Sequence, residues 1–138
     1  MSKFIIYSDG GARGNPGPAA TGFLIYQNNK LIAQKSTFIG SATNNTAEYQ
    51  AVIHALTYYK KHHFNNTPIS IDFYLDSNLI VNQLSGKYKI KKSHLIQLAS
   101  SVHQLLHLLK ATFRFHYIPR AKNHKADALV NQALDQQS

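Results

Sequence analysis

The order of short apolar segments is the feature that most constrains the fold of this chain. Three such segments come first, at residues 3–8, 21–26 and 31–38, and each has the length of a single strand. The residues 27–30 between the last two, Gln-Asn-Asn-Lys, predict a hairpin and therefore an antiparallel pair. Two more strand-like segments follow at 69–75 and 112–118.

Apolar residues at helical spacing predict helices over about 45–61, 77–84, 94–110 and 123–133. Asn45 is expected to cap the first helix, and Gly86 to end the second. The resulting order, β-β-β-α-β-α-α-β-α, predicts an α/β fold. Its five-stranded mixed sheet has the second strand antiparallel and is flanked by helices.

Length and composition limit the class of protein. The chain has 138 residues without an internal repeat or a linker, so one domain over 1–138 is expected. No segment has the roughly 20 apolar residues that cross a membrane, and Asp9 interrupts the N-terminal apolar run, so we expect a cytoplasmic protein. The monomeric state that we also expect does not follow from the residues; it is what the family resemblance described below implies. The absence of cysteine excludes disulfides and thiolate chemistry.

The charge balance indicates a polyanionic partner. Fifteen Lys and Arg residues face six Asp and Glu residues, which gives a net charge of +9 and a sequence pI near 9.8. Nucleic acid is the leading candidate for such a partner. The scarcity of acids makes the position of each one informative.

Four of the six acids stand where strands end or helices begin. Asp9 and Asp76 follow the first and fourth predicted strands, and Glu48 and Asp127 fall in the first turns of two helices. If those two strands are parallel neighbours, the four carboxylates converge on one edge of the sheet. They would then repel one another unless cations neutralised them, and oxygen ligands suit Mg²⁺ or Mn²⁺. Two such ions about 4 Å apart can catalyse phosphodiester hydrolysis.

Three of these four acids also have a purely structural explanation, whereas Asp9, between an apolar strand and a glycine-rich turn, is harder to explain in this way. Glu48 three residues after Asn45 resembles a capping box, Asp76 could cap the next helix, and Asp127 could stabilise a helix dipole. Asp72 lies within a predicted strand and is interpreted as structural. The constellation is therefore more specific than any of its members.

Four segments resemble the motifs of the ribonuclease H type 1 family, in its order and spacing between about residues 3 and 133. They are DGGARGNPGP at 9–18, TNNTAEY at 43–49, DSN at 76–78 and IPRAKNHKAD at 118–127. The resemblance implies a ribonuclease H-like fold and an endonuclease that cuts the RNA strand of RNA–DNA hybrids, leaving 5′-phosphate and 3′-hydroxyl ends. It also implies two Mg²⁺ (or Mn²⁺) ions held by Asp9, Glu48, Asp76 and Asp127.

The resemblance further implies which residues contact the hybrid. It assigns these contacts to Gly10, Asn15, Thr43, Asn44, Asn45 and Asn78, with Thr43 on a phosphate of the DNA strand. Turn and cap chemistry would account for the same residue types. Lys87 and Lys89 belong to a lysine-rich segment that is expected to follow phosphates, although such a run is often only a solvated loop.

One departure from the family concerns a histidine that many members carry before the last helix. Arg120, seven residues before Asp127, matches a variant found in part of the family and is assigned an auxiliary catalytic role. His124 is expected on the helix itself. Two alternatives stay open: a nucleic-acid-binding module of the same fold that does not cleave, and a related nuclease that cuts DNA. His103 and His107 resemble a zinc helix but lack its glutamate base, so zinc is disfavoured.

Overall fold

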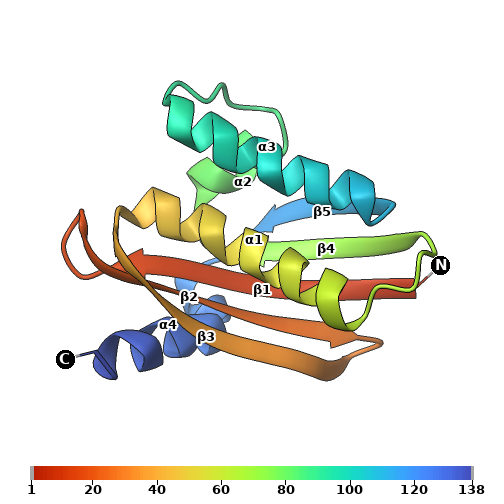
Figure 1. Cartoon of the computed structure of the whole chain (residues 1–138), viewed down its shortest axis with the longest axis horizontal. Coiled ribbons are helices and arrows are strands. Elements are labelled where there is room, and N and C mark those ends of the chain that lie inside the picture. Colours follow the sequence, from red (N-terminus) through yellow and green to blue (C-terminus); the bar gives the residue numbers. More distant parts are fainter. Residues whose placement is uncertain (1, 138) are drawn as a thin grey trace.

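The computed structural model describes residues 2–137, which form one mixed sheet with helices on both faces (Figure 1). The strands run in the order β3-β2-β1-β4-β5. Their bounds are β1 Ser2–Ala12, β2 Gly17–Gln27, β3 Lys30–Ala42, β4 Ile69–Leu75 and β5 Ala111–Tyr117. β2 is antiparallel to β1 and β3, whereas β1, β4 and β5 are parallel, so the predicted α/β class and mixed sheet are confirmed.

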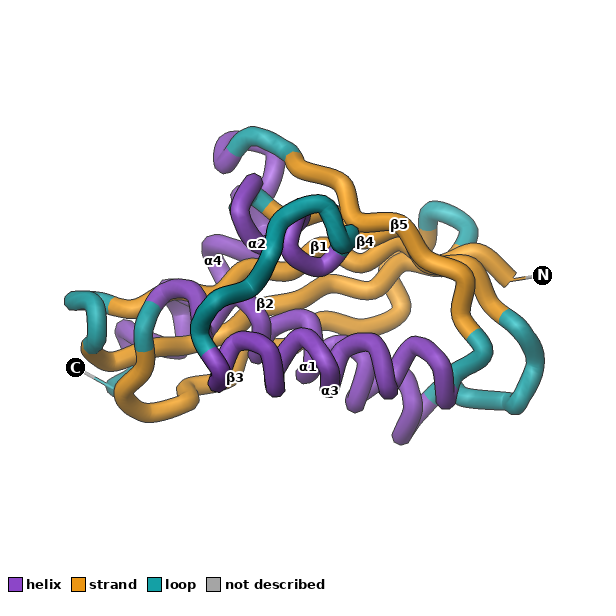
Figure 2. The backbone as a smooth tube through the Cα atoms, turned by 90° about the horizontal axis from the view of Figure 1, so that it is seen from above, coloured by secondary structure: helices purple, strands orange, loops and turns teal. Residues whose placement is uncertain are grey.

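The helices are α1 Asn44–His62, α2 Asn78–Leu84, α3 Ser93–Leu108 and α4 His124–Asp135, and a 3-10 turn, Arg120–Asn123, precedes α4. Figure 1 shows α1, α2 and α3 on one face of the sheet and α4 on the other, below β2 and β3. Viewed from above, α1 and α3 run side by side along the sheet (Figure 2). None of the described helices is long and apolar enough to cross a membrane.

The hairpin between β2 and β3 forms where it was predicted. Asn28 and Asn29 occupy its turn with φ values of 52° and 65°, a left-handed conformation that asparagine tolerates well. Gly86, which follows α2, has φ 79° and ends that helix as predicted.

The predicted cap of α1 is wrong, and the alternative explanation of Asp76 as the cap of α2 is excluded as well. Thr43, not Asn45, caps α1, because its hydroxyl accepts a hydrogen bond from Thr46 N at 3.2 Å. Glu48 consequently lies in the second turn of α1 and forms no capping box. Ser77, not Asp76, caps α2 by accepting from Ile80 N at 3.3 Å, so Asp76 is available for another role.

β1 is also longer than predicted. The strand was expected to end before Asp9, but it continues to Ala12. Its last parallel pair with β4 is Tyr7–Tyr74, whereas antiparallel pairing with β2 extends to Ala12. Asp9 therefore lies within β1, at the point where β4 diverges from it.

Two glycines allow helices from opposite faces to approach the sheet closely. A Cβ on Gly10 would lie 2.1 Å from the carbonyl oxygen of Ala47 in α1, and one on Gly22 would lie 2.6 Å from that of Ala126 in α4. Larger residues at these positions would displace the helices. Since Ala47 and Ala126 immediately precede Glu48 and Asp127, these glycines set the depth at which both acids approach the sheet.

Candidate active site

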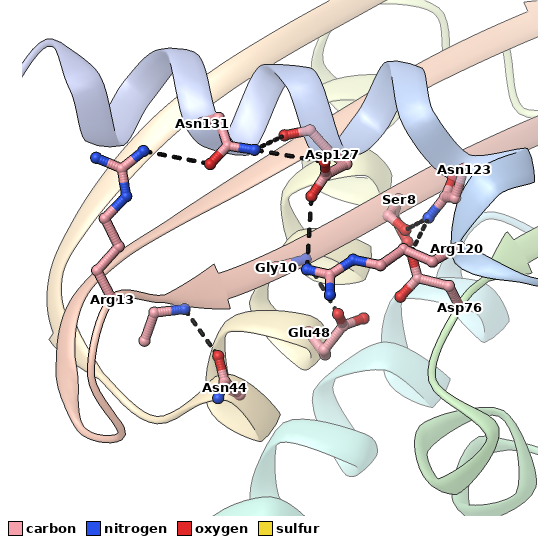
Figure 3. Close-up of polar contacts among 11 residues, drawn as sticks. Ser8, Gly10, Arg13, Asn44, Glu48, Asp76, Arg120, Asn123, Asp127 and Asn131 are labelled. Atoms are coloured by element: carbon pink, nitrogen blue, oxygen red, sulfur yellow. Dashed lines mark hydrogen bonds and ion pairs between the residues drawn. The ribbon is translucent and has the colours of Figure 1, made fainter.

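Three carboxylates meet at the carboxyl end of β1 and β4. Asp9 and Asp76 each lie two residues beyond the Tyr7–Tyr74 pair, so the parallel register brings them to the same level. Glu48 reaches them from α1, and each of the three residues offers an oxygen within 4.8 Å of the other two. The structure thus brings these three acids together, and Figure 3 shows Glu48 and Asp76 of the cluster.

The cluster is buried and short of positive charge. Asp9 and Glu48 are only 5% and 7% exposed. Glu48 Oε1 accepts a long hydrogen bond of 3.4 Å from Gly10 N, and Glu48 Oε2 has no hydrogen-bond partner among the described residues. A buried carboxylate oxygen without a donor is costly, which indicates that a group outside the chain satisfies it.

Burial dominates the protonation of the cluster. It raises the pKa of Asp9 to about 7, with further increases from the charges of Asp76 and Asp127. The pKa of Glu48 is raised well above its usual value, first by burial and then by Asp9. Both shifts favour the protonated carboxyl groups of Asp9 and Glu48 when no cation is bound.

Asp76 is stabilised in part by two neighbours. Burial raises its pKa, while a hydrogen bond from Asn123 and the charge of Arg120 oppose that increase. The possible metal ligands of the cluster are hard carboxylate oxygens, and one of them has no hydrogen-bond partner among the described residues. Three acids meet here with little positive charge beside them. These features fit a divalent cation of the Mg²⁺ or Mn²⁺ kind.

Asp127 faces the same hollow but stands outside the cluster of three. The hollow has a volume of about 550 Å³ and is lined by all four acids together with Arg120. Asp127 lies in the first turn of α4, as predicted, and its side chain is 33% exposed. Its Oδ1 is 3.8 Å from Nη2 of Arg120, whose guanidinium is 82% exposed and extends across the site (Figure 3).

Asn123 is a site residue that sequence reasoning missed. It is 1% exposed, and its Nδ2 donates to the carbonyl of Ser8 at 2.9 Å and to Asp76 Oδ2 at 3.0 Å. It thereby joins the turn before α4 to β1 and to one of the acids. Its position four residues before Asp127 was the available signal, but in the sequence it was indistinguishable from the start of a helix.

Some of the predicted substrate residues lie beside the acids. Gly10 and Asn44 line the hollow. Asn44 Oδ1 accepts from Ala12 N at 2.8 Å, and Asn44 N donates to Asn15 Oδ1 at 2.9 Å, so both asparagines connect the loop after β1 to the start of α1. Thr43 is the cap of α1, and Asn45 is half-buried in its first turn.

The other predicted contacts lie outside the hollow. Asn78 is the first residue of α2, and its Oδ1 accepts from Asn82 at 3.1 Å. Lys87 and Lys89 are exposed in the connection between α2 and α3. Asp72, interpreted as structural, pairs with His116 at 2.7 Å on β5.

The strand order, together with the acid cluster at the point where β1 and β4 diverge, defines the class as ribonuclease H-like. The sequence model of the reverse transcriptase-like family matches residues 7–133. The chain is 38% identical over 130 residues to ribonuclease HI of Halobacterium salinarum, which covers 94% of this chain and 63% of that protein. It is 36% identical to the bifunctional protein Rv2228c of Mycobacterium tuberculosis, of which it spans only 36% of the length.

Solved structures agree with these relatives. LC11-RNase H1 in complex with an RNA/DNA hybrid superposes with a TM-score of 0.92 at 38% identity, covering 97% of this chain and 98% of the other. The RNase H1 of H. salinarum gives a TM-score of 0.88 at 36% identity, with 97% and 98% covered. The chain belongs to the type 1 ribonuclease H family.

Proposed function

We propose that this chain is an endonuclease that hydrolyses the RNA strand of RNA–DNA hybrids with two divalent cations and leaves 5′-phosphate and 3′-hydroxyl ends. The observation that carries the proposal is the buried cluster of Asp9, Glu48 and Asp76, with its unpartnered Glu48 oxygen. A relative that is 38% identical was solved with an RNA/DNA hybrid, which supports the same substrate class here.

Asp9, Glu48, Asp76 and Asp127 are the residues that would hold the cations. When bound, Mg²⁺ or Mn²⁺ would supply an activated water and stabilise the leaving oxygen of the phosphodiester. Because the pKa values of Asp9 and Glu48 are raised, cation binding would be coupled to proton release from these carboxyl groups. Asn123 keeps Asp76 oriented toward the hollow by holding Oδ2.

The loop after β1 and the start of α1 would contact the hybrid. Gly10 and Asn44 border the hollow, and a hydrogen bond holds Asn15 beside Asn44. Backbone and amide groups of this region would thus face the minor-groove edge of the RNA. Thr43, Asn45 and Asn78 are assigned further contacts to the hybrid. Lys87 and Lys89 would bind phosphates outside the hollow and add affinity without sequence preference.

Arg120 is proposed as an auxiliary residue. Its guanidinium is exposed beside Asp127, where it can reach a phosphate oxygen of the substrate. Its charge also lowers the pKa of Asp9 and Asp76, which favours the ionised carboxylates that a cation needs.

The decisive test is cleavage of one end-labelled RNA in three forms: paired to DNA, paired to RNA, and single-stranded, each with Mg²⁺, Mn²⁺ or EDTA. Cleavage of the hybrid alone, abolished by EDTA and by Asp9→Asn or Asp76→Asn, is the expected result. Asp72→Asn is the matched control. Asp72 lies on β4, the strand that leads to Asp76, but its carboxylate bonds to His116 and not to the acid cluster. Binding of the hybrid without cleavage under either metal would instead identify a non-cleaving module.

A further inference from the structure

Asp127 stands apart from the other three acids and is more exposed than Asp9 and Glu48. It lies outside the cluster within 4.8 Å that Asp9, Glu48 and Asp76 form. Its ion pair with Arg120 is long, at 3.8 Å, and the arginine is 82% exposed, so this pair contributes little to the position of the carboxylate. Among the residues 2–137, Asn131, one turn farther along α4, is the other donor to the Asp127 side chain.

Asn131 contacts Asp127 twice. Its Nδ2 donates to the main-chain oxygen of Asp127 at 3.2 Å and to Oδ2 at 3.4 Å. Its Oδ1 accepts from Nη2 of Arg13 at 3.2 Å. Because a guanidinium can only donate, Arg13 requires the oxygen of this amide to point toward it and thus turns the amide nitrogen toward Asp127.

Arg13 is itself anchored to α4. The same Nη2 forms a salt bridge of 2.6 Å with Asp135 Oδ1. Figure 3 shows Arg13, Asn131 and Asp127 in a row along α4.

Arg13 also begins the loop between β1 and β2. Its main-chain nitrogen donates to Pro18 O at 2.8 Å, and two residues later Asn15 bonds to the start of α1. A hydrogen-bonded path therefore runs from the loop that is assigned to the hybrid to the fourth acid.

We propose that Asn131 is a positioning residue that orients Asp127 for cation binding, and that Arg13 sets the orientation of the Asn131 amide. The proposal rests on the proposed function, since it assumes that Asp127 binds a cation. It implies that the conformation of the loop 13–16 and cation binding at Asp127 are coupled. A contact that orders the loop should strengthen cation binding, and cation binding should order the loop.

The first test measures Mn²⁺ binding to the substrate-free protein. Binding is detected as a decrease in the electron paramagnetic resonance signal of free Mn²⁺. The variants are Asn131→Ala, Arg13→Ala, Asp127→Asn and the control Gln132→Ala, which removes an exposed amide from the next position of α4. Asn131→Ala is expected to weaken the Asp127-dependent binding about 10-fold, as loss of groups that orient metal ligands does. Arg13→Ala shifts it in the same direction by less, and Gln132→Ala leaves it unchanged.

The second test separates positioning from a loss of folded protein. In hybrid cleavage, Asn131→Ala should raise the half-saturating Mg²⁺ concentration about 10-fold, with kcat approaching that of the parent at saturating Mg²⁺. Asn131→Gln, which retains both the donor and the acceptor, should recover part of the shift. A merely structural role would lower the active fraction and leave the half-saturating concentration unmoved, which would overturn the inference.

The two proposals fail in different ways. If Asp127→Asn loses a Mn²⁺-binding step while Asn131→Ala binds like the parent, the positioning role is wrong and the proposed function stands. If Asp127→Asn itself binds Mn²⁺ like the parent, the assignment of Asp127 as a cation ligand is wrong, and the inference fails with it.

Discussion

At the scale of single residues, the site is a set of carboxylates that the fold destabilises. Asp9 and Glu48 are almost fully buried, and their pKa values are raised because the charged forms lose water and repel one another. Such a cluster is preorganised to bind cations but lowers the stability of the protein without them. Substitutions in the cluster should therefore change stability and activity in opposite directions.

Asp9→Asn tests this opposition. At pH 8 without cations, the neutral amide removes a buried charge and still offers a donor to Glu48, so we expect a gain on the order of 2 kcal/mol in the free energy of unfolding. Cleavage should be lost, because the amide cannot replace the carboxylate as a cation ligand. Urea unfolding in EDTA and hybrid cleavage in Mg²⁺ measure the two effects. An equal or lower stability than the parent would contradict the expected strain.

Asn123→Ala should act in the opposite direction on stability. The substitution leaves the carbonyl of Ser8 and one oxygen of Asp76 without their donor, which costs about 2 kcal/mol for buried groups. Asp76 is also less restrained, so the half-saturating Mg²⁺ concentration should increase about 10-fold. Urea unfolding and a Mg²⁺ titration of cleavage check both expectations. An unchanged Mg²⁺ requirement would show that Asn123 serves the fold alone.

At the scale of elements, the site depends on how closely α1 and α4 approach the sheet. Gly10→Ala would place a methyl group 2.1 Å from Ala47 O, so α1 must move and carry Glu48 away from Asp9. We expect the free energy of unfolding to fall by about 3 kcal/mol. Cleavage activity should be lost as well, because Glu48 leaves the cluster. Gly11→Ala is the control for stability, because its Cβ would meet Val130 at an ordinary 3.7 Å. Equal stability of both variants would exclude tight α1 packing as the cause.

The elements also show which parts of the site are predictable from sequence. Apolar periodicity places Asp9 and Asp76 after parallel strands, and the parallel register then brings them to the same level. The extension of β1 to Ala12 was not predictable, because pairing with β2 overrides the low strand propensity of Gly10 and Gly11. The roles of Asn123 and Asn131 depend on contacts with Ser8 and Arg13, more than 110 residues away in the chain, and no local pattern encodes them.

At the scale of the whole molecule, the raised carboxyl pKa values link stability to pH. The Asp9 carboxyl has a pKa of about 7 in the folded protein and 3.8 ordinarily, so between these values the folded state binds a proton that the unfolded state lacks. Without cations, this contribution to stability is complete below about pH 4 and is lost as the pH rises through 7. Burial lowers the pKa of His54 below 6.5, which has the opposite effect in the acidic part of this range.

The difference between the parent and Asp9→Asn cancels the His54 contribution and leaves that of Asp9 together with its effect on Glu48. We expect the stability gained by Asp9→Asn in EDTA to grow from near zero at pH 4 to its full value above pH 7, and to shrink when Mn²⁺ binds the parent. Urea unfolding at several pH values, with and without Mn²⁺, measures this difference. A gain that does not vary with pH would mean that the Asp9 carboxyl is already ionised at pH 4.

The net charge of +9 should make binding of the hybrid depend on salt concentration. Lys87 and Lys89 are exposed and lie outside the hollow, so they can bind phosphates of the hybrid without touching the reacting bond. Replacing both with alanine should raise KM and make the dependence of log KM on log salt shallower by about one to two, while kcat stays the same. Steady-state cleavage of one hybrid at several salt concentrations checks this. Lys30→Ala, at the first position of β3, is a control that removes one positive charge elsewhere on the molecule. A fall in kcat with an unchanged salt slope would mean that the lysine segment acts on the site and not on the phosphate backbone.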